Sequence, residues 1–197
     1  MEQACQALGI RPPLFLECAD RGLAHDCWDS ARDEIVRAIR TVRPDAVLTF
    51  GPDGISGHPD HVALNKIVTA AFWGAGAHAY FSNGRNDTPP FRPPRLYYVL
   101  RSASVPEFCA QDNSGRARPL TTVIDIRDYG DRKLKAIRSY RSQKHLQSED
   151  PGMIDKILKE PEHFHRAVPL LEVTHIETDL LSDLSIEFAS GKHRQTT

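Results

Sequence analysis

The sequence has few of the features that mark membrane proteins or nucleic-acid-binding proteins. No apolar run approaches the about 20 residues that cross a bilayer. The formal net charge is -1 at pH 7, and the Lys and Arg residues are scattered rather than clustered. Because binding to a phosphate backbone needs a basic excess, we expect no nucleic-acid partner. We also expect no membrane association and a cytoplasmic location.

Cysteine is scarce, and its spacing excludes two common uses. The C-x-x-C pattern of zinc fingers and thioredoxins does not occur among the four cysteines, Cys5, Cys18, Cys27 and Cys109. A chain of 197 residues with 40% hydrophobic residues can bury a core without disulfides, although an even cysteine count would allow two of them. We therefore expect one domain over residues 1–197 with reduced, mostly buried thiols.

Local patterns predict helices that alternate with short apolar strands. Three signals mark helix ends: Gly9 as a stop, Ser30 and Asp33 in a capping relation, and Pro59 at a first helical position. The expected helices cover the opening stretch up to Gly9 and residues 34–42, 59–72, 128–144 and 151–159. The expected strands cover residues 14–18, 46–50, 95–100 and 121–126. Residues 82–94 and 108–119 are expected to be surface loops.

This alternation is typical of the α/β class. We expect a three-layer, Rossmann-like fold around a largely parallel sheet. Ligands of such sheets bind beyond the carboxyl ends of the strands. The loop that follows the strand at residues 46–50 falls there, so it is the first candidate for a functional site.

That loop reads GPDGISGHPDH, residues 51–61, and it places two histidines close together. With Pro59 opening a helix, His58 lies near the helix cap and His61 one turn on, so both rings can face one crevice. Imidazole binds zinc and also exchanges protons near neutral pH. A plain capping and hydrogen-bonding pair is the alternative. Ser56 does not fit the G-x-S-x-G pattern of a serine nucleophile.

The stretch TFGPDGISGHPDHVA resembles the second signature of the LmbE / PIG-L family of metal-dependent N-deacetylases, which act on N-acetylglucosamine units. Four other stretches resemble this family in the same order, namely LFLECADRGL, RPDAVLTF, TTVIDIRDYGDRKLKAIRSYRSQ and EHFHRA. The resemblance covers most of residues 1–167. It implies a hydrolase that uses Zn²⁺ or Fe²⁺ and acts on a small glycoconjugate.

The resemblance also implies roles for individual residues. His61 corresponds to the metal-binding His of the motif, and His58 to the His that assists the tetrahedral intermediate. Asp60 is expected to orient a neighbour or to cap the helix. Asp20, in the D-x-G-L turn, would border the substrate pocket or simply form the turn. His163 and His165 flank Phe164, which the resemblance places in packing, so they are weaker metal candidates.

One motif of the resembled family is absent from the sequence. Family members carry an early His-Pro-Asp-Asp motif that supplies two more ligands and the general base, whereas His-Pro-Asp occurs here only at residues 58–60. A catalytic zinc normally has three protein ligands. We therefore expect a truncated deacetylase with weakly held metal, little activity, missing N-terminal strands and possible self-association.

Two alternatives to an active deacetylase remain. The chain could be a non-catalytic relative that binds a sugar or a partner. It could also be a different α/β hydrolase that uses His58 as a base.

Overall fold

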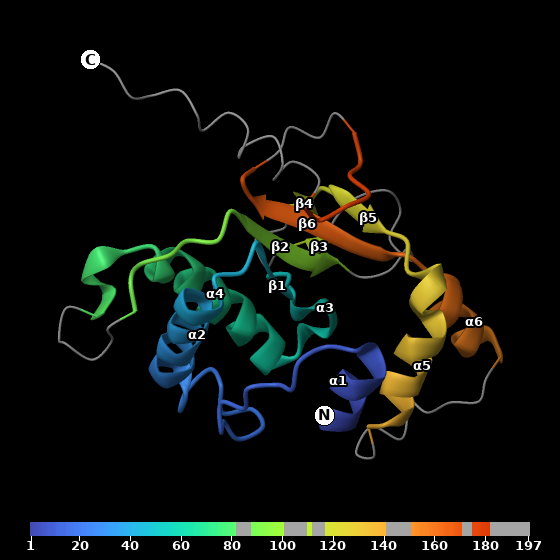
Figure 1. Cartoon of the computed structure of the whole chain (residues 1–197), viewed down its shortest axis with the longest axis horizontal. Helices are drawn as coiled ribbons and strands as arrows, with labels where there is room; N and C mark the ends of the chain where they lie inside the picture. Colours follow the sequence, from blue (N-terminus) through green and yellow to red (C-terminus); the bar gives the residue numbers. More distant parts are fainter. Residues whose placement is uncertain (82–87, 101–109, 112–116, 141–150, 171–174, 182–197) are drawn as a thin grey trace. The chain divides into compact units, whose positions relative to one another are not determined.

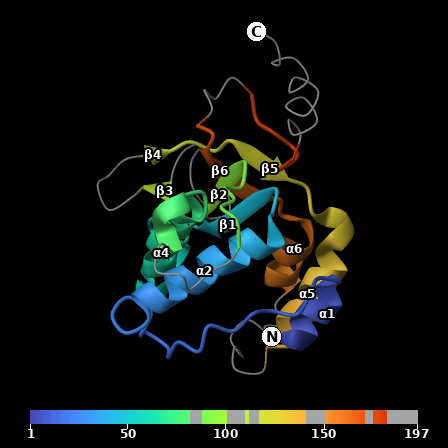
Figure 2. The same ribbon diagram turned by 60° about the vertical axis from the view of Figure 1, so that its left-hand side comes forward.

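The computed structural model describes residues 1–81, 88–100, 110–111, 117–140, 151–170 and 175–181. The chain divides into two compact units. The smaller comprises Met1–Glu17 and Ile124–Glu162, and the larger comprises Cys18–Val123 and His163–Thr197. Figures 1 and 2 show the helices and strands of both units. The single domain over residues 1–197 stays a prediction.

The smaller unit is helical. It contains α1 (Glu2–Leu8), η2 (Arg127–Tyr129), α5 (Gly130–Arg138) and α6 (Pro151–Lys159). Gly9 ends α1 in the left-handed conformation, with φ 72°, as its sequence position predicts. A Cβ atom at Gly130 would lie 2.7 Å from the carbonyl oxygen of Leu158. The contact between α5 and α6 therefore requires glycine at this position.

Two predictions for this part of the sequence need correction. The strand predicted over residues 14–18 is wrong, because residues 10–19 form no regular structure and Leu14 and Phe15 are 79% and 65% exposed. An apolar run becomes a strand only where a partner strand can pair with it, and the described residues provide none here. The helix predicted over 128–144 begins at Gly130 and ends at Arg138, while residues 141–144 lie outside the described ranges.

The larger unit is built from a sheet with helices on one face. Helix α2 (Trp28–Val42) packs on α4 (Pro59–Ala75) through Val36 and Ile39, which contact Ala71 and Ala75. Phe72 of α4 packs against strand residues of the sheet. Figures 1 and 2 show α2 and α4 side by side below the sheet. The end of α2 at Val42 and the start of α4 at Pro59 agree with the sequence predictions.

The sheet has the strand order β1-β2-β6-β5, with β1 (Ala46–Phe50), β2 (Arg95–Leu100), β5 (Thr122–Ile124) and β6 (Glu162–Val168). Strands β1 and β2 are parallel, and β2 and β6 are antiparallel. The α/β class is confirmed, and the sheet, predicted to be largely parallel, contains both parallel and antiparallel pairs. A separate antiparallel pair joins β3 (Ala110–Gln111) to β4 (Ala117–Arg118), inside the predicted loop 108–119.

Strand β1 lies at one edge of this sheet. Val47 faces the α2–α4 core, whereas Leu48 is 45% exposed on the strand.

Strand β6 was not predicted from the sequence. Its polar side chains are buried because they have long-range partners: Arg166 forms an ion pair of 2.8 Å with Glu177, and the two side chains are 2% and 4% exposed. The Thr122 hydroxyl donates to the other carboxylate oxygen of Glu177 at 3.0 Å. A buried ion pair of this kind gives no apolar signal in the sequence.

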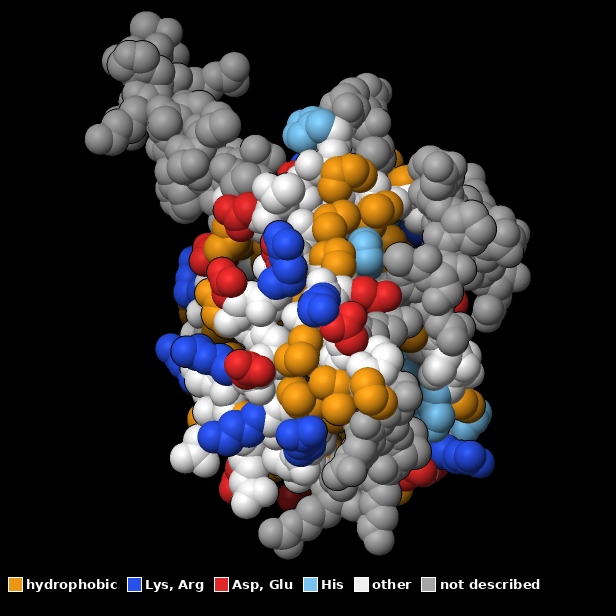
Figure 3. All heavy atoms as spheres, turned by 90° about the vertical axis from the view of Figure 1, so that its right-hand side faces the viewer, with side chains coloured by type: hydrophobic (Ala, Val, Ile, Leu, Met, Phe, Trp, Pro, Cys, Tyr) orange, Lys and Arg blue, Asp and Glu red, His pale blue; other side chains and the backbone are white. Residues whose placement is uncertain are grey.

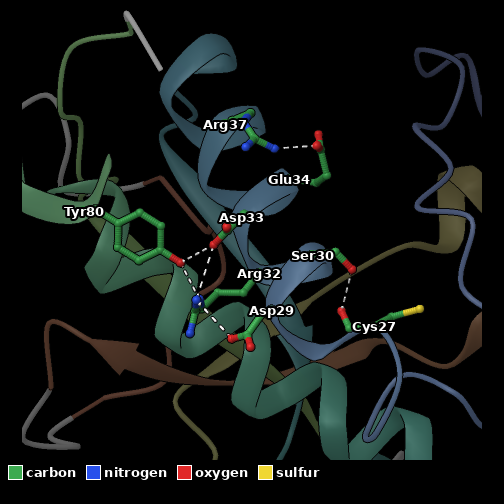
Figure 4. A network of polar contacts seen from close by, with 8 residues as sticks. All are labelled: Cys27, Asp29, Ser30, Arg32, Asp33, Glu34, Arg37 and Tyr80. Carbon is green, nitrogen blue, oxygen red and sulfur yellow. Dashed lines mark hydrogen bonds and ion pairs between the residues drawn. The ribbon is translucent and has the colours of Figure 1, made fainter. Parts of the chain in front are cut away.

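Helix α2 begins earlier than its predicted cap. Its N-cap is Cys27, and Ser30 lies inside the helix with its hydroxyl donating to the Cys27 carbonyl at 3.1 Å. The Ser30–Asp33 capping relation is therefore wrong. Asp33 instead accepts a hydrogen bond of 2.8 Å from the hydroxyl of Tyr80, which also contacts Arg32. Figure 4 shows this network, which fixes the 3-10 turn η1 (His78–Phe81) against α2.

One face of the described surface matches the scattered charge of the sequence. On the face drawn in Figure 3, Lys and Arg side chains alternate with Asp and Glu and form no block of one sign. In the predicted loop 82–94, residues 88–94 have no helix or strand, and residues 82–87 lie outside the described ranges. Within the described parts, no helix is both long and apolar enough to cross a membrane.

Candidate active site

The predicted site loop lies directly beyond the carboxyl end of β1. The side-chain amide of Asn65 in α4 donates to the carbonyl of Phe50 at 2.7 Å, and so ties the helix to the end of the strand. Between them the chain forms a short helical turn, α3 (Gly54–Gly57). A histidine at the start of α4 is therefore held at the strand end where α/β sheets bind ligands.

Gly54 brings this loop into close contact with α4. Its φ is 63°, and a Cβ atom there would lie 2.9 Å from the Cβ of His61 and 2.9 Å from the backbone nitrogen of Val62. Only glycine satisfies both the left-handed backbone and the missing space. The next residue, Ile55, also has φ 63°, which is a strained conformation for a β-branched side chain.

The ring of His61 is fixed by two contacts. Its Nδ1 lies 3.1 Å from the carbonyl oxygen of Gly54, and the ring stacks on Phe50 with centroids 4.0 Å apart and planes 7° apart. A carbonyl only accepts, so this hydrogen bond assigns the proton to Nδ1. In the neutral ring, Nε2 then carries the free lone pair. Metal-binding histidines commonly have this arrangement, with the other ring nitrogen donating to a backbone carbonyl.

The ring of His58 has the opposite arrangement. His58 is the N-cap of α4, and its Nδ1 accepts a hydrogen bond of 3.2 Å from the backbone N–H of Asp60. Because Nδ1 is the acceptor, the proton of the neutral ring is on Nε2. The capping interpretation and the chemical one are therefore compatible, since they use different nitrogens. The ring centroids of His58 and His61 are 5.1 Å apart.

Asp60 connects the start of α4 to the segment that contains Asp20. Its Oδ2 accepts a hydrogen bond of 2.6 Å from the backbone N–H of Arg21, while its Oδ1 is buried without a hydrogen-bond partner among the described residues. The exposed side chain of Asp20 lies beside this contact. Asp20, His58 and Asp60 each offer a ligand atom, and these atoms lie within 4.8 Å of one another.

The structure thus brings together the four predicted site residues in two overlapping groups. His58 and His61 share the start of α4, and Asp20 and Asp60 gather around His58. The contact between Arg21 and Asp60 was not predicted, because 39 residues separate them and no local sequence pattern indicates it. The capping alternative holds for His58, because its side chain is the cap of α4.

The other histidine pair lies away from this group. Phe164 is 3% exposed, as predicted for a packing residue. His165 is also buried, with its Nδ1 at 2.9 Å from the carbonyl oxygen of Pro119, and burial lowers the pKa of its ring. Neither His163 nor His165 belongs to the group of possible ligands that the described residues form.

The donor set of the site fits a divalent cation. Imidazole nitrogen and carboxylate oxygen are ligands that both zinc and iron accept. The unpaired buried Oδ1 of Asp60 is a further observation in favour of a cation, because a buried carboxylate oxygen normally has a partner. Among the described residues, the atoms that could hold it together come from Asp20, His58 and Asp60, and His61 lies outside this group.

The protein belongs to the α/β class and has a mixed sheet. Its H-x-x-H pair lies at the start of α4, beyond the carboxyl end of strand β1. Residues 1–72 match the family profile described as "PIG-L: GlcNAc-PI de-N-acetylase". The resemblance to the LmbE / PIG-L family is therefore confirmed over this part of the chain.

Several similar curated proteins are also named as deacetylases. The chain is 32% identical over 131 residues to the 1D-myo-inositol 2-acetamido-2-deoxy-alpha-D-glucopyranoside deacetylase of Rhodococcus jostii (strain RHA1), covering 58% of this chain and 44% of that protein. It is 30% identical over 177 residues to the protein of that name from Rhodococcus erythropolis, covering 73% and 58%. The chain spans about half the length of the curated relatives it matches.

Two solved structures share the fold. One is the conserved protein TT1542 from Thermus thermophilus, with a TM-score of 0.60 and 23% identity, covering 87% of this chain and 72% of that one. The other is GalB, the 4-carboxy-2-hydroxymuconate hydratase from Pseudomonas putida KT2440, with a TM-score of 0.61 and 18% identity, covering 85% and 69%. At these identities the likeness shows the fold alone, so function must be argued from the site.

Proposed function

We propose that this chain carries the metal- and oxyanion-binding part of an N-deacetylase that acts on a small molecule containing N-acetylglucosamine. The observation that carries the proposal is the complementary state of two neighbouring rings. His61 presents a lone pair at Nε2, and His58 presents an N–H at Nε2. Metal-dependent hydrolysis of an amide uses both a group that holds the cation and a group that donates to the developing oxyanion.

His61 is proposed as the metal ligand on the strength of the family resemblance, and the oxygen donors Asp20 and Asp60 gather around its neighbour His58. A bound Zn²⁺ or Fe²⁺ would supply Lewis-acid chemistry, lowering the pKa of a water molecule and polarising an amide carbonyl. The Gly54 carbonyl would keep His61 in the ligating tautomer, and Phe50 would keep its ring from rotating. Either cation suits these nitrogen and oxygen donors.

His58 is proposed to act on the oxygen of the substrate amide. Its Nε2–H can donate to the oxyanion that develops when water adds to the acetamide carbon. The same N–H can keep this hydrogen bond while a proton of the attacking water passes to the departing amine, which leaves as the C–N bond breaks. The hydrogen bond from the Asp60 backbone to Nδ1 holds the ring in the tautomer that this role requires.

Asp20 is proposed to contact the substrate. Its carboxylate is exposed, it lies within the group around His58, and its segment is fixed by the bond between Arg21 and Asp60. A carboxylate in such a position accepts hydrogen bonds from hydroxyl groups, which a sugar presents in number. Asp60 is proposed to act as a positioning residue for this segment.

The 197-residue chain by itself is proposed to be a weak deacetylase. His-Pro-Asp-Asp does not occur in the sequence, so the proposed base on the water molecule has no match here. The edge position of β1 and the exposed Leu48 favour association through this strand, with a second copy as the proposed partner.

The test is a deacetylation assay with a 2-acetamido-2-deoxy-glucopyranosyl inositol, in which released primary amine is measured with and without added Zn²⁺ or Fe²⁺. We expect slow, metal-stimulated amine release that His58→Gln and His61→Ala abolish. The exposed His78→Ala is the matched control and should retain the rate. Release that is independent of metal and of both histidines would overturn the proposal.

The second candidate function is sugar binding without catalysis, which the missing motif favours. Isothermal titration with zinc and with the same N-acetyl sugar separates the two. Sugar binding that Asp20→Asn weakens, together with no zinc binding, would support the second candidate. Zinc binding that requires His61 would support the deacetylase.

A further inference from the structure

Two cysteines meet in the segment that leads into α2. Cys18 and Cys27 are half-buried thiols outside any disulfide, and their side chains are hydrogen-bonded to each other. They are nine positions apart in the sequence, so the chain between them must turn back on itself. Sulfur atoms that share a hydrogen bond need only a small rearrangement to reach bonding distance.

The backbone between the two thiols forms a compact turn. The carbonyl oxygen of Gly22 accepts hydrogen bonds from the backbone N–H groups of His25, Asp26 and Cys27, at 3.2, 2.8 and 3.3 Å. Gly22 is itself buried, and a Cβ atom there would lie 3.1 Å from the carbonyl oxygen of Ala19. Because the turn is fixed by backbone groups, the meeting of the two thiols is a property of the fold and not of side-chain rotamers alone.

This turn also contains the residues that reach the candidate active site. Asp20 belongs to the group around His58, and the Arg21 backbone donates to the Asp60 carboxylate. A covalent link between positions 18 and 27 would therefore close a loop that includes both.

We propose that Cys18 and Cys27 are a modification site that forms a reversible intrachain disulfide, and that this bond fixes the loop that presents Asp20 and Arg21 to α4. The oxidant is a low-molecular-weight disulfide. One cysteine thiolate attacks it and displaces one small thiol, which leaves a mixed disulfide on the protein. The second cysteine, after losing its proton, displaces the other small thiol. Two S–H bonds are lost, one S–S bond forms, and the small disulfide is reduced to two thiols.

The test is oxidation of the full chain by oxidised glutathione, followed by peptide mapping without reduction. We expect a linked peptide pair containing Cys18 and Cys27, reversed by dithiothreitol, with the free-thiol count falling by two. Cys18→Ser and Cys27→Ser should each lose the linked pair and accumulate a glutathione adduct instead. Cys5→Ser and Cys109→Ser are the matched controls and should retain it.

A second measurement keeps the proposal testable if a variant folds poorly. Arg21 is exposed and lies inside the closed loop, so trypsin cleavage after it reports on loop freedom. We expect the oxidised wild-type chain to be cleaved there several-fold more slowly than the reduced chain, and its two fragments to stay joined until reduction. Equal cleavage rates with no joined fragments, or glutathione adducts without any Cys18–Cys27 link, would overturn the proposal.

Discussion

Gly54 contacts His61 in two ways. Its carbonyl forms a hydrogen bond with the His61 ring, and its lack of a side chain leaves the space that the His61 Cβ occupies. The carbonyl of Gly54 fixes Nδ1 of His61 at 3.1 Å, and the space that a Cβ atom would need is already filled by the His61 Cβ, 2.9 Å away. The glycine therefore determines where the ring can lie and which of its nitrogens is free. A change at Gly54 is therefore expected to alter both the stability of the loop and the orientation of the His61 ring.

The first prediction follows from that contact. Gly54→Ala should lower the free energy of unfolding by about 2–3 kcal/mol, because it adds a steric clash to the cost of a left-handed backbone for alanine. Gly57→Ala is the matched control, since Gly57 also has a positive φ of 73° but nothing lies within 4 Å of an added Cβ. It should cost only about 1 kcal/mol. Urea denaturation measures both, and equal losses would contradict the role given to the clash.

The second prediction separates the two histidines by metal binding. His61→Ala should weaken Zn²⁺ binding by at least about 100-fold, because it removes the nitrogen proposed as the ligand. His58→Asn should change the affinity far less, since asparagine can still accept the Asp60 N–H as a helix cap. Competition with a fluorescent zinc chelator measures both affinities. Equal losses in the two variants would show that His58 is a ligand as well.

The third prediction concerns the ionisation of Tyr80. Burial raises the pKa of its hydroxyl to about 12, and the hydrogen bond to Asp33 acts in the same direction. The folded state thus holds this proton more tightly than the unfolded state, whose reference pKa is 10.0. The stability that Tyr80 contributes should be complete below pH 10 and should be lost as pH rises from 10 to 12.

Comparison with Tyr80→Phe tests this prediction. The difference in unfolding free energy between wild type and variant should shrink over that pH range, and ultraviolet titration should show the missing tyrosinate only near the upper end. A difference in stability that stays constant from about pH 9 to pH 12 would contradict it, since this interval spans the reference and the shifted pKa of Tyr80.

The fourth prediction concerns the buried pair Arg166–Glu177. Arg166→Met should destabilise the fold by about 3–5 kcal/mol, because it leaves the Glu177 carboxylate buried without its cation. Replacing both partners, with Met at 166 and Leu at 177, should recover most of that loss. Arg127→Met is the control, because its partner Asp125 is exposed and the change should have little effect. Thermal unfolding of the four chains measures the series.

The helices and strands predicted correctly are those whose apolar pattern or end signal lies in the nearby sequence. Strand β1 is a short apolar run, α2 ends before Pro44, and α4 begins at Pro59, and each of these signals lies inside the element or beside its end. The run at residues 14–18 is also apolar, yet it forms no strand. A strand needs a partner strand from a distant part of the chain, so the local sequence alone does not predict it. Strand β6 shows the reverse case, since its buried Arg166 depends on Glu177, which lies beyond the end of the strand.

The candidate site divides in the same way. The motif identified His58 and His61, and Pro59 placed both at the start of one helix. The tautomers of the two rings could not be predicted, because they depend on the Gly54 carbonyl and the Asp60 amide in a folded loop. The position of Asp20 beside His58 depends on a contact across 39 residues, which only tertiary structure creates.

The cap of α4 has an evolutionary consequence. Folding depends on one nitrogen of His58 and the proposed reaction depends on the other, so selection can act on each separately. A descendant that exchanged this residue for asparagine would keep its helix, its sheet and its expression level, while its turnover disappeared. Sequence surveys that count intact folds as working enzymes would misassign such a descendant, and the identity of this single residue would reveal the loss.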